Sequence, residues 1–280
     1  MARRTAPALV VAALCAAFAA LVWVLAFHSG AGISADHAAL RGFGALDDLH
    51  LHPLAEAIAR LCDPLPYAVL CLGVLAHTYR TRGPRGVLAA LAILAAANGL
   101  THVLKELAAQ PRPVFDMHVL AASWPSGHAT AAMALALCAT IAARPEARRL
   151  TAIAGGLFAV GVADSVVLLG WHFPSDVLGG FAVAGAATGL VVAATAWAEA
   201  RWPAGTGRRA LQGRATVAVW WPGVAAGIGV AAVLIAIAFG YITSVYGTRT
   251  EGPAFVVCAA VIAGLGFALA AAGSTVPAES

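Results

Sequence analysis

Charged residues are scarce in this sequence: they make up 11% of its 280 residues, whereas hydrophobic residues make up 61%. Soluble domains carry about 25% charged residues, so the composition excludes an ordinary soluble globular protein. Lysine is almost absent, and Lys105 is the single example. The net charge of +4 does not indicate a nucleic-acid-binding surface, because basic residues in such a chain mostly follow membrane topology.

Cysteine is also infrequent, and its pattern does not indicate a disulfide framework. The five cysteines show no paired spacing and fall mostly inside apolar runs, which predicts buried free thiols. The first apolar run, 7–27, follows Arg3 and Arg4 and resembles a secretory signal. It is too long for the apolar part of a signal peptide, and no cleavage site precedes His28, so we expect a retained transmembrane helix.

Apolar runs of about twenty residues recur along the chain, each long enough to cross the ~30 Å hydrocarbon layer of a bilayer. They predict an all-α polytopic membrane protein with eight transmembrane helices, at 7–27, 54–79, 87–108, 128–143, 150–170, 174–197, 220–243 and 254–273. With these helices, twelve basic residues fall on one side and five on the other. The positive-inside rule then places both termini in the cytoplasm.

The runs also predict how the chain is divided. We expect a transmembrane core over 1–200, a basic cytoplasmic linker over 201–216 and a C-terminal transmembrane hairpin over 217–280. The outer loop 28–53 is apolar enough to include a short interfacial helix.

Polar side chains concentrate where the predicted topology brings separate segments to the outer surface. Lys105 and Arg112 lie at the end of one helix, and Ser126, Gly127 and His128 begin the next. Fixed positive charges and the free N–H groups of a helix N-terminus form a natural site for an anion such as phosphate. Gly127 would let that anion approach the main chain closely.

The segment DSVVLLGWHFPSD, residues 164–176, adds His172 and Asp176, four residues apart. A carboxylate that holds a histidine fixes its tautomer and leaves the other ring nitrogen as a nucleophile. His128 is a candidate acid, since two histidines with different partners can divide these roles.

These segments resemble the three motifs of the type 2 phosphatidic acid phosphatases, the PAP2 superfamily. KELAAQPRP fits the motif K-x6-R-P, and PSGH fits the second motif. The third, S-R-x5-H-x3-D, is matched by Ser165, His172 and Asp176. Three spaced motifs in the right order make the resemblance specific, and it implies a six-helix core.

The resemblance implies a membrane phosphatase in which His172 attacks phosphorus and forms a phosphohistidine. Asp176 would orient His172, and His128 would protonate the leaving oxygen. The non-bridging oxygens would be held by Lys105, Arg112, Ser126 and the Gly127 amide. No metal or other cofactor is implied, because fixed cations and amides neutralise the phosphoryl charge.

One position departs from the family pattern. Val166 stands where the family usually has an arginine, which would be a further clamp on the phosphoryl oxygens. Losing one such donor costs about 10²–10³ in rate, or roughly 3–4 kcal/mol. Arg249 is our candidate for a replacement cation among the outer basic residues.

The predicted function is hydrolysis of a lipid phosphate or pyrophosphate at the extracytoplasmic face of the cytoplasmic (inner) membrane. The substrate classes are polyprenyl lipids of cell-envelope synthesis, such as undecaprenyl pyrophosphate, and phosphatidic-acid-type lipids. The predicted partners are the bilayer and its lipid phosphate, with no nucleic acid. The C-terminal hairpin is a candidate surface for homo-oligomerisation.

Several alternatives stay open from the sequence. With an alcohol as acceptor, the same phosphohistidine would make the protein a lipid phosphotransferase. A non-catalytic lipid-binding or transport protein could retain the same scaffold. His172 and Asp176 could instead ligate a metal. The segment DDLHLH, residues 47–52, also suggests a metal site, although a solvated loop is favoured there.

Overall fold

The computed structural model describes residues 2–112, 123–202 and 251–274. Its regular structure in these ranges is helical, without strands. Two 3-10 turns, Ala45–Leu49 and Arg60–Cys62, accompany the α-helices. These are α1 (Ala2–His28), α2 (Gly30–Gly44), α3 (His52–Ala59), α4 (Pro64–Ala108), α5 (Gly127–Ala142), α6 (Pro145–Leu168), α7 (Pro174–Arg201) and α9 (Glu251–Ser274).

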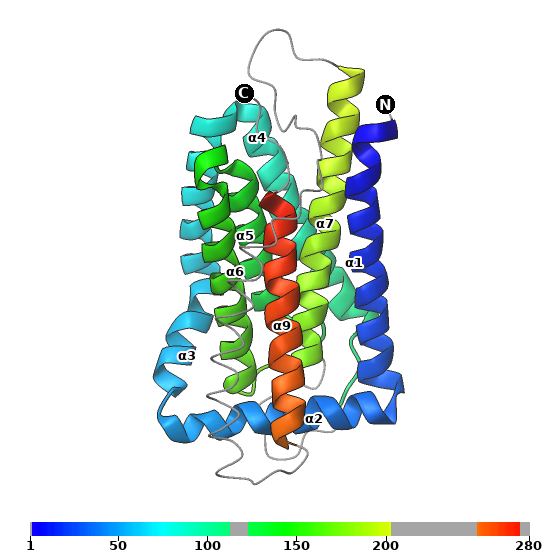
Figure 1. The fold of residues 1–280 in the computed structure, drawn as a ribbon, viewed down its shortest axis with the longest axis vertical. Coiled ribbons are helices and arrows are strands. Elements are labelled where there is room, and N and C mark those ends of the chain that lie inside the picture. Colours follow the sequence, from blue (N-terminus) through cyan, green and yellow to red (C-terminus); the bar gives the residue numbers. More distant parts are fainter. Residues whose placement is uncertain (1, 113–122, 203–250, 275–280) are drawn as a thin grey trace.

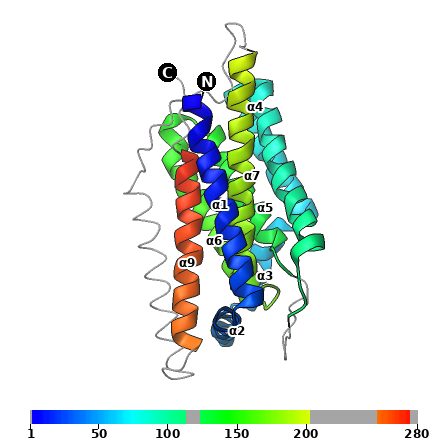
Figure 2. The same cartoon turned by 90° about the vertical axis from the view of Figure 1, so that its right-hand side faces the viewer.

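The long helices form one bundle, with α2 lying across one of its ends (Figures 1 and 2). Among the residues described, α1, α4, α6, α7 and α9 are each long and apolar enough to cross a membrane, and α5 is a shorter apolar helix. The prediction of an all-α polytopic membrane protein is therefore confirmed. The predicted helix 220–243 and all but the first two residues of the predicted linker 201–216 lie outside the described residues, so the division at 200 stays a prediction.

The segment α4 consists of two helices that form a hairpin. Gly83 interrupts it with φ 73° and ψ −169°, and Pro84 follows. The two halves then run side by side, since the Asn98 side chain donates to the Tyr67 hydroxyl at 3.3 Å across the hairpin. They correspond to the predicted helices 54–79 and 87–108.

The first of these predicted helices differs from the structure at its beginning. The predicted continuous helix from 54 was wrong, because α3 ends at Ala59 and α4 starts only at Pro64. Asp63 lies between them with extended backbone, φ −65° and ψ 155°. The cause is the proline, whose ring disfavours helical geometry in the residue before it.

Small residues let the helices pack closely. At Gly189 of α7, a Cβ would lie 2.8 Å from the backbone oxygen of Ala8 in α1. Such contacts drive association between helices in lipid, where burial from water contributes little. The five cysteines are free thiols, as their spacing predicts, but only Cys15 and Cys138 are buried, whereas the other three are half-buried.

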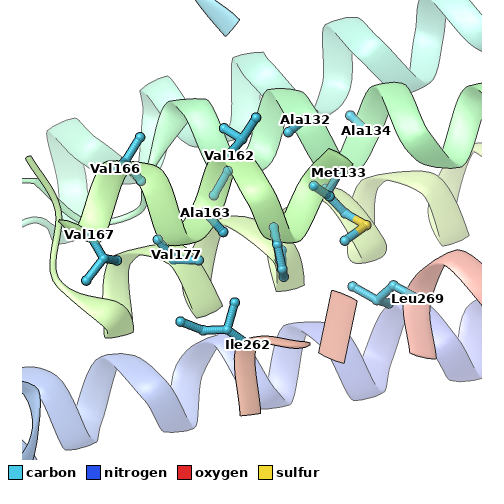
Figure 3. Packing of buried hydrophobic residues seen from close by; sticks show 14 of the residues in the cluster. Ala132, Met133, Ala134, Val162, Ala163, Val166, Val167, Val177, Ile262 and Leu269 are labelled. Carbon is cyan, nitrogen blue, oxygen red and sulfur yellow. The ribbon is translucent and has the colours of Figure 1, made fainter. Parts of the chain in front are cut away.

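The apolar core joins α5, α6, α7 and α9 (Figure 3). Figure 3 shows Met133, Val162, Val177 and Ile262 within one cluster of buried side chains. Helix α9 therefore packs against the same core as the helices that precede residue 200. Phe255 of α9 also contacts the Phe43 ring of α2, with centroids 4.8 Å apart.

Helix α2 agrees with the short helix predicted in segment 28–53. Ser29 caps it by accepting from the Gly32 amide at 3.2 Å, which satisfies one of the amides at the helix start. Its inner face buries Leu40 and Phe43 and also the charged residue Asp36. A buried carboxylate is costly unless it is paired, so α2 must meet polar groups there.

Candidate active site

The loop between α6 and α7 places His172. Gly170 has φ +68° and ends α6, with its amide donating to the Val167 carbonyl at 2.9 Å. The Trp171 amide donates to the Val166 carbonyl at 3.0 Å, and the His172 amide reaches the same oxygen at 3.3 Å. The first two bonds form a Schellman motif, which favours glycine at the left-handed position. The backbone of residue 166 therefore anchors the loop that carries the histidine.

His172 and Asp176 form the pair that their spacing predicts. Nδ1 of His172 lies 3.3 Å from Oδ2 of Asp176, and both side chains are buried. Pro174 starts α7, so Asp176 lies in its first turn and accepts from the Phe173 amide at 3.0 Å. With Nδ1 facing the carboxylate, Nε2 is the ring nitrogen left for chemistry.

Arg112 lies beside this pair, buried between two carboxylates. Nη2 donates to Oδ1 of Asp176 and to the Ser123 hydroxyl, the latter at 3.1 Å. Nη1 donates to Oδ2 of Asp36 and to the Ser175 hydroxyl, both at 2.9 Å. The guanidinium also stacks on two aromatic rings, at 4.0 Å from the centroid of Phe173 and 4.9 Å from that of Phe27. We expected Arg112 on phosphoryl oxygens, but both terminal nitrogens donate to protein groups.

The start of α5 is a capped helix N-terminus within the same cluster of polar residues. Ser126 is the N-cap and accepts from the Ala129 amide at 3.4 Å, while its own amide donates to the Asp176 carbonyl at 2.9 Å. The amides of Gly127 and His128 follow in the first turn, where N–H groups have no helical acceptor. Among the described residues, a Cβ built on Gly127 would meet no atom within 4 Å, so no described side chain covers the main chain at this position.

His128 lies across from His172, with ring centroids 6.5 Å apart. Its Nε2 is 3.3 Å from Oδ1 of Asp63, the residue that precedes α4. Each histidine thus has its own carboxylate. Lys105, near the end of α4, is half-buried and interacts electrostatically with both Asp176 and His128. It therefore belongs to the same cluster.

Val166 is fully buried in the apolar core, where Figure 3 shows it beside Val162 and Val167. Its side chain contributes only apolar surface, and its carbonyl supports the histidine loop. The candidate replacement cation, Arg249, lies outside the described residues.

Four polar residues of this cluster were missed by the sequence analysis: Asp36, Asp63, Ser123 and Ser175. Asp36 accepts from the Ser175 amide at 3.0 Å and from its hydroxyl at 2.6 Å. The Ser123 hydroxyl donates to Oδ2 of Asp176 at 2.5 Å. For the two aspartates, the available signal was the scarcity of charged residues in the sequence. A carboxylate in such a chain needs a charged or hydrogen-bonding partner.

Comparison with known proteins identifies the architecture. A family model described as the PAP2 superfamily matches residues 86–201. Residues 86–201 belong to the PAP2 superfamily. The resemblance inferred from the three motifs is therefore confirmed, and the PAP2 region includes α5, α6, α7 and the second half of α4. Asp36 and Asp63 both precede it.

A solved structure extends the similarity beyond that region. The crystal structure of a transmembrane PAP2-type phosphatidylglycerolphosphate phosphatase from Bacillus subtilis matches with a TM-score of 0.59 and 26% sequence identity. The match covers 69% of this chain and 98% of that protein. A comparison with curated proteins gives no match. The PAP2 membrane fold is therefore supported by both sequence and structure.

Proposed function

We propose that the protein is an integral membrane phosphatase that hydrolyses a lipid phosphate or pyrophosphate through a phosphohistidine on His172. The observation that carries this proposal is the pairing of two histidines, each with its own carboxylate. The Asp176 side chain is 3.3 Å from His172, and Asp63 is 3.3 Å from His128. A site that only binds an anion, or a residue that only caps a helix, does not require two histidines that are each paired with a carboxylate.

In the first step, Nε2 of His172 attacks the phosphorus and a P–N bond forms. The bond from phosphorus to the leaving oxygen breaks, and His128 donates a proton to that oxygen. Asp176 stabilises the positive charge that develops on the His172 ring. In the second step, water attacks the phosphorus and gives its proton to His128. The P–N bond then breaks, which releases phosphate and restores neutral His172.

The non-bridging oxygens would meet Lys105 and the amides of Gly127 and His128. Amides at a helix start carry the positive end of the helix dipole and need no reorganisation during the reaction. Arg112 would act on the phosphate indirectly, because its charge is directed at Asp176. In this proposal Ser126 holds the helix start in place through its capping bond.

The substrate head would enter at the α2 end of the bundle, with the lipid tail in the bilayer. Helix α1 begins and α9 ends at the opposite end (Figure 1). This arrangement agrees with cytoplasmic termini and an extracytoplasmic site in the inner membrane. It also agrees with the excess of basic residues on the side of the termini.

The test is phosphate release by detergent-purified protein in the presence of EDTA. The panel contains phosphatidylglycerolphosphate, phosphatidic acid, a polyprenyl monophosphate and undecaprenyl pyrophosphate, and the blank is His172→Ala. We expect release from at least one lipid, lost in the variant and unaffected by EDTA. Release that needs an added alcohol would indicate a phosphotransferase, and no release in either case would favour a non-catalytic lipid-binding protein.

A further inference from the structure

Asp36 is a buried carboxylate at the site that comes from outside the PAP2 region. It lies on α2, which crosses the end of the bundle, and its exposed fraction is 7%. Three groups donate to it: Nη1 of Arg112, the Ser175 amide and the Ser175 hydroxyl. The donors are separated from it in sequence by 76 and 139 residues, so folding alone brings them together.

The two sides of Arg112 are built alike. On one side Asp176 and Ser123 accept from Nη2, and Ser123 also donates to Asp176. On the other side Asp36 and Ser175 accept from Nη1, and Ser175 also donates to Asp36. One guanidinium is therefore shared between two carboxylates, and the three charged groups together carry one negative charge.

This sharing has a consequence for the catalytic pair. If Asp36 were neutral, the full charge of Arg112 would fall on Asp176. Asp176 would then be less able to stabilise a cationic His172, because a carboxylate that is fully ion-paired offers less charge to a second partner. Arg112 would also lose a charge-assisted hydrogen bond that fixes its position.

We propose that Asp36 is a positioning residue of the active site, which acts through Arg112 to leave Asp176 oriented and negatively charged towards His172. Helix α2 is then part of the catalytic apparatus rather than only an interfacial helix. The inference rests on the proposed phosphatase function. It assigns no contact between Asp36 and the substrate.

The ionisation of Asp36 supplies a way to test this role. Burial raises the pKa of Asp36 to about 6, while the charge of Arg112 acts in the opposite direction. The negative charge of Asp176 also raises the pKa of Asp36, and the two hydrogen bonds from Ser175 lower it. Other titratable groups near Asp36 are Cys258 of α9, which it affects electrostatically, and His37, the next residue of α2. Neither donates a hydrogen bond to it among the described residues.

The experiment compares wild type with Asp36→Asn, which keeps the shape of the side chain and removes its charge. Phosphate release is measured from pH 5 to 8.5, with whichever lipid of the panel above wild type cleaves fastest. We expect the kcat of Asp36→Asn to be about tenfold lower than that of wild type at pH 8, because Asp176 then supports His172 less well. KM should change little, because Asp36 does not contact the substrate. Below about pH 6, where wild-type Asp36 is protonated, the ratio of the two activities should approach one.

Glu56→Gln is the matched control, because Glu56 is a carboxylate at the same end of the bundle whose ion pair among the described residues is with the exposed Arg60. It should leave kcat unchanged. If Asp36→Asn only disturbs folding, the ratio of its activity to that of wild type would be reduced equally at every pH. That result would overturn the inference. Equal activity of Asp36→Asn and wild type at pH 8 would overturn it as well. Wild-type protein without activity would instead overturn the proposed function, and this inference with it.

Discussion

Replacing Gly170 tests whether the end of α6 controls the position of His172. Its φ of +68° lies in the left-handed region, and a Cβ there would meet no atom of the described residues within 4 Å. Gly170→Ala therefore adds no clash, and its cost is backbone strain of about 1–2 kcal/mol. For a protein of this size, that strain should lower the thermal midpoint in detergent by roughly 2–6 °C.

The same substitution should also reduce activity. If the loop relaxes to relieve the strain, the bonds from Trp171 and His172 to the Val166 carbonyl weaken. Each 1.4 kcal/mol lost from the catalytic geometry corresponds to about tenfold in rate, so loss of the full ~1–2 kcal/mol would lower kcat about 5- to 30-fold. Phosphate release and differential scanning fluorimetry measure the two effects.

Two further variants sharpen this test. Gly170→Asn should lose less stability, because asparagine tolerates the left-handed region better than alanine. Gly99→Ala is the control, since Gly99 is helical and exposed with free space around it, and the change should not destabilise the protein. A Gly170→Ala protein as stable and active as wild type would refute the assigned role of this turn.

Three other predictions concern residues around the site. Asp63→Asn should lower kcat about tenfold with KM little changed, because His128 loses its charged partner, and steady-state kinetics with an unaltered kcat would contradict this. Gly127→Ala should raise KM about tenfold without lowering the thermal midpoint, since the methyl group fills the open space where the anion is expected; an unchanged KM would place the anion elsewhere. Because the pKa of Asp36 is raised from 3.8 to about 6, its contribution to stability is fully present below about pH 4 and is lost as the pH rises through 6. Thermal unfolding measured between pH 4 and 7.5 should show this loss of stability, of up to about 3 kcal/mol, in wild type but not in Asp36→Asn. Stability that changes with pH in the same way in both proteins would contradict this prediction.

Much of the fold was predictable because hydrophobic runs of membrane length are read directly from the sequence. Interruptions were harder to foresee, since the break at Asp63 depends on one proline inside an apolar run. The site was predictable where its residues lie close together in the chain, as do His172 and Asp176 on one helical turn. Asp36 and Asp63 were not, because their partners lie 65 to 139 residues away and only the bundle brings them together.

The role of Arg112 shows a second limit. The resemblance of the first motif to that of the PAP2 superfamily predicts that Arg112 binds phosphate, and its positive charge agrees with that role. The structure adds two carboxylates and two serines that take up its terminal nitrogens. A motif records which residue is present, whereas the direction of its hydrogen bonds depends on segments outside the motif.

The most direct test of the account is detection of the phosphorylated enzyme. Wild-type protein is mixed with excess lipid substrate, quenched in alkali within milliseconds to seconds, digested and analysed by mass spectrometry. The account predicts an acid-labile phosphoryl group on His172, absent from His172→Ala, that disappears as phosphate is released. Phosphate release without such a group, or a phosphoryl group on His128 instead, would contradict it.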